Sequence, residues 1–526
     1  AHLDVDNVAA GQFTAETGNV ITGVGTAGGV ANADVQGADG AHVSAIASNN
    51  VSGNTATTVG GDLVINGQYG VLTIGADGEY SYVRNPGTAG GVSDVFTYTL
   101  SDGDADTDTA TLTINIGNSV PTIGTIPAAG GEDTQVYEAG LLASRGAGES
   151  AGSDASKSTV ADGTIGFTSK DGVGSVSLGG HALSDDAAHP TEFADGTRGT
   201  VSAYYTYDAT TGAGTIHYSY TLVDNTGDDT SVTYAVVVTD ADGQGSGAGH
   251  DLVINIVDDA PTAHLDVDNV AAGQFTAETG NVITGVGTAG GVANADVQGA
   301  DGAHVSAIAS NNVSGNTATT VGGDLVINGQ YGVLTIGADG EYSYVRNPGT
   351  AGGVSDVFTY TLSDGDADTD TATLTINIGN SVPTIGTIPA AGGEDTQVYE
   401  AGLLASRGAG ESAGSDASKS TVADGTIGFT SKDGVGSVSL GGHALSDDAA
   451  HPTEFADGTR GTVSAYYTYD ATTGAGTIHY SYTLVDNTGD DTSVTYAVVV
   501  TDADGQGSGA GHDLVINIVD DAPTAH

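Results

Sequence analysis

The 526-residue chain contains no cysteine, which excludes disulfide bonds, thiolate metal sites and a thiol nucleophile. It has only 10 lysine and arginine residues against 66 aspartate and glutamate residues, so its formal net charge at pH 7 is -56. So few cations cannot form a basic patch for nucleic acid, and we expect no nucleic-acid partner. No apolar run approaches the length of about 18 residues that spans a bilayer, so we also expect no membrane span.

The chain is an exact internal repeat. The sequence that starts at Ala1 starts again at Ala263, which gives a period of 262 residues. The last two residues, Ala525 and His526, would begin a third copy, so we expect the chain to be a window from a longer array. The period far exceeds the roughly 20–50 residues of solenoid repeats, so each copy should contain complete domains. At about 100–150 residues per domain, we expect two domains per copy.

The composition is that of a folded chain despite its charge. Hydrophobic residues make up 38% of the sequence, and Val, Ile, Leu and Tyr fall in alternating runs. Because like charges oppose compaction, we expect bound counter-ions to neutralise part of the carboxylate charge.

Alternation of apolar and polar residues predicts β-strands separated by turns rich in Gly, Asp and Asn. The strands predicted in the first copy are 19–23, 42–47, 62–66, 70–75, 79–83, 94–100 and 110–116, then 135–142, 164–169, 174–180, 199–208, 213–222, 230–240 and 250–257. Seven strands in each half match the strand count of an immunoglobulin-like sandwich. Each half ends in a long strand, an acidic loop, a last strand and a proline segment. The domain boundaries that we predict are 1–117, 118–262, 263–379 and 380–526.

Ordered motifs in each half resemble known repeats. "YGVLTIGADGEYSYV" followed by "DVFTYTLSDGDADTDTATLTINI" resembles a VCBS repeat, a cadherin-like sandwich of long bacterial surface proteins. "YSYTLVDNTGDD" followed by "VVVTDADGQGSGAGHDLVINIVDDAP" is similar to the immunoglobulin-like repeats of giant adhesins secreted by the type I route. The resemblance implies an extracellular, calcium-folded array on the bacterial cell surface, in adhesion or biofilm formation. Its expected partners are neighbouring repeats of the same chain and, through the parent protein, cell-surface or matrix molecules.

We therefore expect an all-β fold of tandem immunoglobulin/cadherin-like β-sandwiches, with two different sandwiches in each of two identical 262-residue copies. The expected function is that of a structural spacer. No catalytic constellation is apparent: close carboxylate pairs arise by chance among so many acidic residues, and no "GxSxG" nucleophile elbow is present. We expect no enzyme activity.

The acidic loops also predict calcium sites from the residues themselves. Carboxylate and amide oxygens at two-residue spacing suit a hard cation with six to eight oxygen ligands. In an immunoglobulin-like sandwich the last hairpin loop lies where the chain enters, so the loop of each domain should face the linker that precedes it. The predicted calcium ligands are Asp258, Asp259, Asp266, Asp268, Asn269, Asp364, Asp366, Asp368 and Asp370 at the joint between copies, Asp240, Asp242, Asn118, Asp502, Asp504 and Asn380 at the joints within copies, and the equivalent Asp4, Asp6, Asp102, Asp104 and Asp106.

Two alternatives remain open from the residues. Asp and Gly dominate ordinary turns, so the acidic loops can equally be solvated turns without an ion. The strand "AYYTYD" suggests direct binding of a glycan or surface through Tyr204, Tyr205 and Tyr207. Consecutive tyrosines on a strand point to opposite faces, and an ordinary half-buried strand accounts for them as well. In the next strand, the alternation around His217 predicts that its side chain lies on the exposed face.

Overall fold

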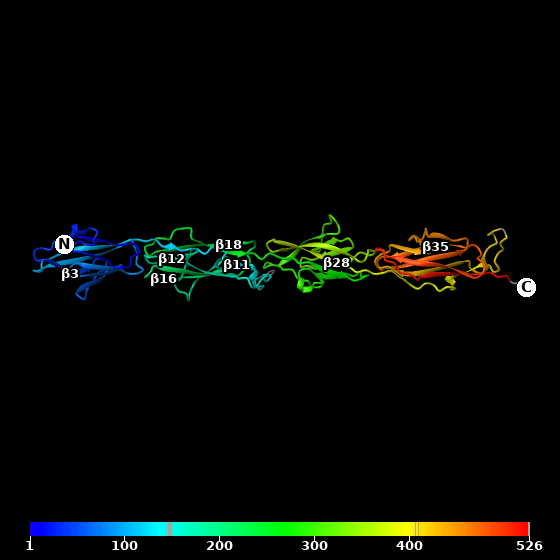
Figure 1. Cartoon of the computed structure of the whole chain (residues 1–526), viewed down its shortest axis with the longest axis horizontal. Helices are drawn as coiled ribbons and strands as arrows, with labels where there is room; N and C mark the ends of the chain where they lie inside the picture. Colours follow the sequence, from blue (N-terminus) through cyan, green and yellow to red (C-terminus); the bar gives the residue numbers. More distant parts are fainter. Residues whose placement is uncertain (144, 146–149, 406, 409, 524–526) are drawn as a thin grey trace. The chain divides into compact units, whose positions relative to one another are not determined.

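The computed structural model describes residues 1–143, 145, 150–405, 407–408 and 410–523 (Figure 1). Strands carry nearly all of the regular structure, and the helices among these residues are short 3₁₀ turns. In the described part of the chain no helix has the length and apolar character needed to cross a membrane. The predicted all-β fold of tandem sandwiches is confirmed.

The chain divides into two compact units, Ala1–Asp259 and Ala260–His526. The division falls three residues before the second copy of the repeat begins at Ala263. Each unit contains four sheets with equivalent strand orders. Two facing sheets around a shared core form one sandwich, so each unit holds a first and a second sandwich.

The first sandwich of unit 1 is built from a four-stranded and a five-stranded sheet. In sheet order the strands are β1 (Asp4–Val8), β9 (Thr107–Ile116), β8 (Ser93–Asp102) and β3 (Ala41–Ser48), facing β2 (Glu16–Asn19), β7 (Glu79–Arg84), β6 (Gly70–Ile74), β5 (Asp62–Asn66) and β4 (Thr57–Val59). Phe96 and Leu112 from one sheet and Leu72 and Tyr82 from the other are fully buried in one cluster. This shared core is the main source of stability for a sandwich.

The second sandwich of unit 1 has five strands in each layer. The layers are β10 (Thr122–Ile123), β12 (Val160–Thr168), β17 (Ala213–Leu222), β16 (Gly199–Asp208) and β15 (Thr191–Asp195), and β11 (Gln135–Tyr137), β19 (Asp251–Val257), β18 (Thr230–Thr239), β13 (Ser175–Leu178) and β14 (His181–Ala182). Along β17, side chains alternate between the core and the outer face, as in a sheet with one buried side.

Unit 2 repeats this architecture. Its first sandwich consists of β20 (Asp266–Val270), β28 (Thr369–Ile378), β27 (Val354–Asp364) and β22 (Ala303–Ser310), facing β21 (Glu278–Asn281), β26 (Glu341–Arg346), β25 (Gly332–Ile336), β24 (Asp324–Asn328) and β23 (Thr319–Val321). Its second consists of β29 (Thr384–Ile385), β31 (Val422–Thr430), β36 (Ala475–Leu484), β35 (Gly461–Asp470) and β34 (Thr453–Asp457), facing β30 (Gln397–Tyr399), β38 (Asp513–Val519), β37 (Thr492–Thr501), β32 (Ser437–Leu440) and β33 (His443–Ala444). The 3₁₀ turns of the two units are η1 (Gly29–Asn32), η2 (Glu132–Thr134) and η3 (Glu138–Gly140), and η4 (Gly291–Asn294), η5 (Glu394–Thr396) and η6 (Glu400–Gly402).

In each sandwich an early strand runs parallel to the last one: this is the first strand, β1, in the first sandwich and the second strand, β11, in the second. β1 pairs with β9, with Asp4 opposite Leu112, and β11 pairs with β19. Because β9 is antiparallel to β8, the β8–β9 loop lies at the same end of the sheet as the start of β1. The acidic loops therefore lie at the end of the sandwich where the chain enters, which is the end assumed in the calcium prediction.

Several local predictions from the sequence were wrong. The described residues form nine strands in the first sandwich and ten in the second, where seven were predicted in each half, and the strand predicted at 135–142 ends at Tyr137. The strand predicted at 19–23 lies earlier, at Glu16–Asn19, because the Asn19 side chain caps a turn by accepting hydrogen bonds from the backbone N–H groups of Ile21 (2.9 Å) and Thr22 (2.8 Å). The strand β1 was missed because two of its inward positions carry Asp4 and Asp6, which reverses the usual polarity pattern.

A buried hydrogen bond to Asp94 should contribute measurably to the first sandwich. The Tyr82 hydroxyl donates to Asp94 Oδ2 at 2.8 Å, and both residues are fully buried. Replacing Tyr82→Phe together with Tyr344→Phe removes a donor to a buried carboxylate, so we expect a loss of about 1–3 kcal/mol in the free energy of unfolding of that sandwich. Calorimetric unfolding measures it. Tyr69→Phe is the control, because its hydroxyl has no hydrogen-bond partner among the described residues; equal effects of the two changes would contradict the prediction.

Candidate functional site

A buried ion pair joins the two sandwiches of unit 1. Arg84, the last residue of β7, places Nη1 2.9 Å from Oδ1 of Asp171, which lies between β12 and β13 of the second sandwich. Both side chains are fully buried. The guanidinium also donates to the carbonyl and hydroxyl oxygens of Thr88 and lies 5.7 Å from the centre of the Phe13 ring. Nε, Nη1 and Nη2 of this arginine therefore each donate a hydrogen bond within the joint.

The second oxygen of Asp171 holds the linker between the sandwiches. Asp171 Oδ2 accepts a hydrogen bond from the backbone N–H of Ser119. A Cβ atom placed on Gly90 would lie 2.2 Å from Asp171 Oδ2 and 2.8 Å from Asn118 Oδ1. The two side-chain oxygens thus gather over a glycine, where any larger residue would displace them.

The loop after β18 brings a second buried carboxylate to this joint. The Ala241 N–H donates to the Asp171 carbonyl oxygen at 3.3 Å. Asp240 is 1% exposed: its Oδ1 accepts from the Gln244 N–H at 2.7 Å, and its Oδ2 is buried with no hydrogen-bond partner among the described residues. Burial, followed by the hydrogen bond with Asp242, raises the pKa of Asp240 to about 6. The joint therefore contains an unsatisfied carboxylate oxygen.

Unit 2 has the same joint. Arg346 Nη1 lies 2.9 Å from Asp433 Oδ1, and both side chains are buried. Oδ2 of Asp502, the counterpart of Asp240, is likewise buried without a hydrogen-bond partner in the described part of the chain. Burial, followed by the hydrogen bond with Asp504, raises the pKa of Asp502 to about 6.

Of the predicted ligands, Asn118 and Asp240 therefore lie near Asp171, a residue that the sequence did not single out, and Asp242 lies beside Asp240. Neither Arg84 nor Asp171 has a local signal, because "VRNPG" and "KDGVG" read as a strand end and a turn. The scarcity of cations was the one available hint, since an arginine in so acidic a chain is a candidate partner for a buried carboxylate.

The β8–β9 loop and its copy form two compact groups of carboxylates. One oxygen each from Asp102, Asp104 and Asp106 lies within 4.8 Å of the others, as do oxygens of the second group, Asp364, Asp366 and Asp368. Asp102 Oδ1 accepts hydrogen bonds from the N–H groups of Asp104 (3.3 Å) and Asp106 (2.9 Å).

Backbone strain accompanies these groups. Ala105 and its copy Ala367 have φ values of +71° and +81°, a conformation that costs energy for any residue with a Cβ atom. The backbone therefore holds the loop carboxylates together against their mutual repulsion.

Four predicted ligands lie inside the first sandwiches. Asp4 and Asp6 point inward from β1, where Tyr98 donates to Asp4 at 2.9 Å and Tyr80 donates to Asp6 at 2.6 Å. Asp266 and Asp268 have the same tyrosine partners in unit 2.

Two further predicted ligands also have partners within one unit. Asn269 accepts a hydrogen bond from the Asn377 side chain at 3.2 Å on the outer side of its sheet. Asp259 accepts hydrogen bonds from the backbone and hydroxyl of Ser153.

The three tyrosines proposed for ligand binding do not share one face. Tyr205 and Tyr207 contact Phe167 on the core side, and the Tyr207 hydroxyl donates to the Ser169 carbonyl oxygen at 2.7 Å. Tyr204 alone lies on the outer face, where its ring stacks on His217 at 4.6 Å. The outer face therefore presents one half-buried pair of aromatic rings.

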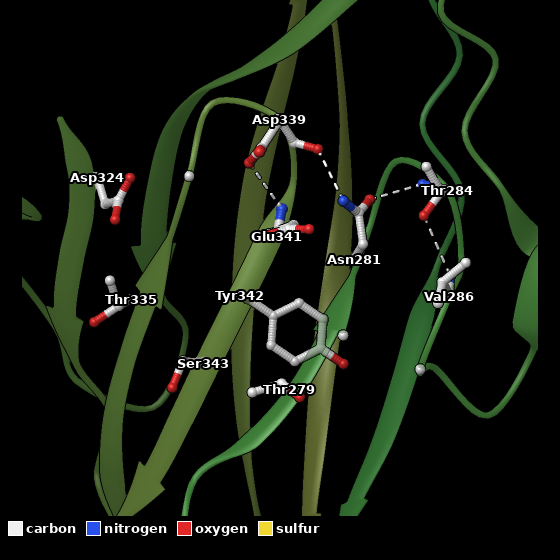
Figure 2. Close-up of a pocket in the computed structure, with 13 residues that line it drawn as sticks. Thr279, Asn281, Thr284, Val286, Asp324, Thr335, Asp339, Glu341, Tyr342 and Ser343 are labelled. Carbon is white, nitrogen blue, oxygen red and sulfur yellow. Dashed lines mark hydrogen bonds between the residues drawn. The ribbon is translucent and has the colours of Figure 1, made fainter.

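A hollow on the outer side of the β21–β26 sheet is lined mostly by small and polar residues (Figure 2). Figure 2 shows Asn281 donating to the Asp339 carbonyl oxygen (3.0 Å) while the Glu341 N–H donates to Asp339 Oδ1 (3.2 Å). The Thr284 N–H donates to Asn281 Oδ1 (2.8 Å). These bonds fix the turns at the rim, so the shape of the hollow follows from turn geometry.

A model of the bacterial Ig domain matches residues 8–115 and 258–377, the segments that hold the first sandwich of each unit. The first sandwich of each unit is therefore similar to a bacterial Ig domain. No curated protein matches the chain.

Solved structures of cadherins are similar at low identity. The ectodomain of human desmocollin-1 is 10% identical over 100% of this chain and 79% of its own, with a TM-score of 0.24. The extracellular domain of protocadherin gamma B4 is 10% identical over 99% of this chain and 66% of its own, with a TM-score of 0.30. Drosophila N-cadherin EC1–3 is 10% identical over 72% of this chain and 99% of its own, with a TM-score of 0.25.

Breaking the buried pair should loosen the joint within each copy. Arg84→Gln with Arg346→Gln leaves Asp171 and Asp433 as buried charges without a counter-ion, so we expect a loss of about 3–5 kcal/mol per unit in urea unfolding. The control is Arg198→Gln with Arg460→Gln, because Arg198 forms a partly exposed pair with Asp195 at 3.0 Å that contributes about 0–1 kcal/mol.

Neutralising the partner as well, with Asp171→Asn and Asp433→Asn, should restore much of that loss, because the buried charge is then removed. Equal effects of the Arg84 and Arg198 changes would show that the pair does not stabilise the joint.

Proposed function

We propose that the chain is part of the extension region of a giant, type I-secreted bacterial cell-surface adhesin. In this proposal it is a non-catalytic spacer of immunoglobulin-like and VCBS-type, cadherin-like sandwiches, stiffened by calcium at the joints. It would project an adhesive end of the parent protein in cell adhesion or biofilm formation. The match to a bacterial Ig domain and the tandem sandwiches support this function.

The unsatisfied oxygen of Asp240 carries the calcium proposal. A buried carboxylate oxygen without a donor is costly, yet the same oxygen is left over in the identical joint of unit 2. Asp171, Asp242 and Asn118 supply further oxygens and no nitrogen or sulfur, which is the donor chemistry of a hard cation. These four residues would hold the ion at the joint within each copy.

A bound calcium ion would supply positive charge that draws the acidic loop and the linker together. Arg84 neutralises one oxygen of Asp171 permanently, and Ser119 fixes the other with its backbone N–H. The chain's own contribution is therefore to orient the carboxylates before an ion arrives, which lowers the entropic cost of binding.

For the acidic segment 257–269 the proposal rests on the sequence alone. Asp258 and Asp259 lie close to Pro261, which restricts the backbone. Asp266 and Asp268, the other two acidic residues predicted there, point into the first sandwich of unit 2. The domain arrangement 1–117, 118–262, 263–379 and 380–526, with two unlike sandwiches alternating, also stays a prediction. Extracellular calcium would then favour folding after export, because a metal that binds only the native state stabilises it.

Calcium should stabilise and lengthen the particle. In millimolar calcium we expect a higher melting temperature and a longer small-angle scattering profile than in chelator, and a site filled to 100 times its Kd adds about 2.7 kcal/mol. Asp240→Asn with Asp502→Asn should reduce the shift in melting temperature. The exposed pair Asp62→Asn with Asp324→Asn removes the same charge as a control. An absence of any response to calcium would leave the acidic joints as solvated turns.

A second candidate function is direct binding of a glycan at Tyr204. The stacked Tyr204–His217 pair favours it, and in unit 2 the equivalent Tyr466 and His479 line a shallow hollow with Asp424, Ser464 and Ser481. Aromatic faces beside hydroxyl and carboxylate groups suit a neutral sugar.

A glycan array tests this candidate. If it is correct, saturable binding should be lost in Tyr204→Ala with Tyr466→Ala, because the apolar stacking surface is removed from both copies. Tyr69→Ala with Tyr331→Ala, on the first sandwiches, is the control. An array on which the unmodified chain binds no glycan would reject this function.

A further inference from the structure

The first sandwich contains a second group of buried carboxylates, away from the joint between the two sandwiches of the copy. Asp4 on β1 and Asp34, just after η1, are 0% and 7% exposed. Tyr98 from β8 reaches both of them with its hydroxyl group, at 2.9 Å from Asp4 Oδ2 and 3.0 Å from Asp34 Oδ2. The same hydroxyl lies 2.8 Å from the carbonyl oxygen of His2.

The carboxylates of Asp4 and Asp34 have more buried oxygens than hydrogen-bond donors and no cationic partner among the residues that the structure describes. A tyrosine hydroxyl has one proton, so it can satisfy only one of the three oxygens around it. The His2 N–H donates to the other oxygen of Asp34, but Oδ1 of Asp4 is buried with no hydrogen-bond partner among the described residues. No lysine or arginine in the described part of the chain forms an ion pair with either carboxylate.

The second copy, which has the same sequence, shows the same arrangement. Tyr360 lies 3.3 Å from Asp266 Oδ2, 3.0 Å from each oxygen of Asp296 and 2.8 Å from the His264 carbonyl oxygen. Asp266 Oδ1 is again buried without a partner within the described residues.

We propose that each copy binds one calcium ion inside its first sandwich, held by Asp4 and Asp34 in one copy and by Asp266 and Asp296 in the other. Two carboxylates balance the charge of a divalent ion, and the other available donors are the histidine carbonyl and tyrosine hydroxyl oxygens, which suits a hard cation. The site ties β1 to the loop after η1 and to β8 within one sandwich. It does not depend on the calcium proposed for the joints.

Counting bound calcium tests the proposal. In the full 526-residue chain, Asp34→Asn with Asp296→Asn should bind two fewer ions than the unmodified chain in equilibrium dialysis at millimolar calcium. Asp62→Asn with Asp324→Asn removes the same charge from exposed positions and should lose none. An unchanged ion count in the Asp34 variant overturns the internal site.

The melting temperature of the Asp34 variant provides a second readout, which should differ between chelator and calcium. In chelator the Asp34 variant should melt no lower than the unmodified chain, because one of two repelling buried charges is gone. In calcium it should melt lower, because the ion can no longer bind. A variant that melts lower by the same amount in both conditions would show a structural hydrogen bond and overturn the proposal. If the Asp34 variant does not fold, Asp4→Asn with Asp266→Asn makes the same test.

The joint variant separates this inference from the proposed function. Asp240→Asn with Asp502→Asn should lose joint ions while the internal ions remain. Loss of ions in the joint variant alone rejects the internal site and leaves the spacer proposal standing. Loss in the Asp34 variant alone supports the internal site and counts against calcium at the joints within copies.

Discussion

Repulsion between carboxylates is the constraint that shapes this protein. With 66 acidic and 10 basic side chains, most carboxylates must stay in water, and each one that enters the interior needs a donor. The fold meets the need in three ways. Arg84 supplies a full charge to Asp171, Ser153 supplies a hydroxyl and a backbone N–H to Asp259, and tyrosine hydroxyls serve the aspartates inside the sandwich.

Tyrosine is well suited to this task because it serves the core and the carboxylate together. The rings of Tyr80, Tyr82 and Tyr98 fill the first sandwich, while their hydroxyl groups reach Asp6, Asp94 and Asp4. Burial and the neighbouring carboxylates raise the pKa of all three hydroxyls, so they remain donors at any physiological pH. A neutral donor satisfies geometry but does not cancel charge. A carboxylate served only by tyrosine therefore keeps its attraction for a cation.

The sequence predicted those strands in which apolar residues face the core and polar residues face outward in alternation. The long strands β8, β9 and β17 bury every second residue, and their positions follow from that period. β1 breaks the rule because Asp4 and Asp6 occupy inward positions, so its residues read as an acidic segment at a joint. The clustering of Asp102, Asp104 and Asp106 was readable because it is local. The pairing of Arg84 with Asp171, 87 positions apart, depends on how two sandwiches meet, and no spacing along the chain encodes it.

The joint within each copy contains both a buried arginine counter-ion and a buried carboxylate oxygen that has no hydrogen-bond donor in the described part of the chain. Arg84 is fully buried and pairs directly with Asp171, so this contact does not vary with the ions outside. Asp240, beside it, has a buried oxygen with no donor among the described residues. This oxygen is where an ion from outside would bind in the proposed function. A joint built from carboxylates alone would separate whenever cations were scarce, whereas one closed by arginine alone would not respond to calcium. In the proposed function the arginine keeps the two sandwiches in register, and a calcium ion at Asp240 would add stiffness to a contact that already exists.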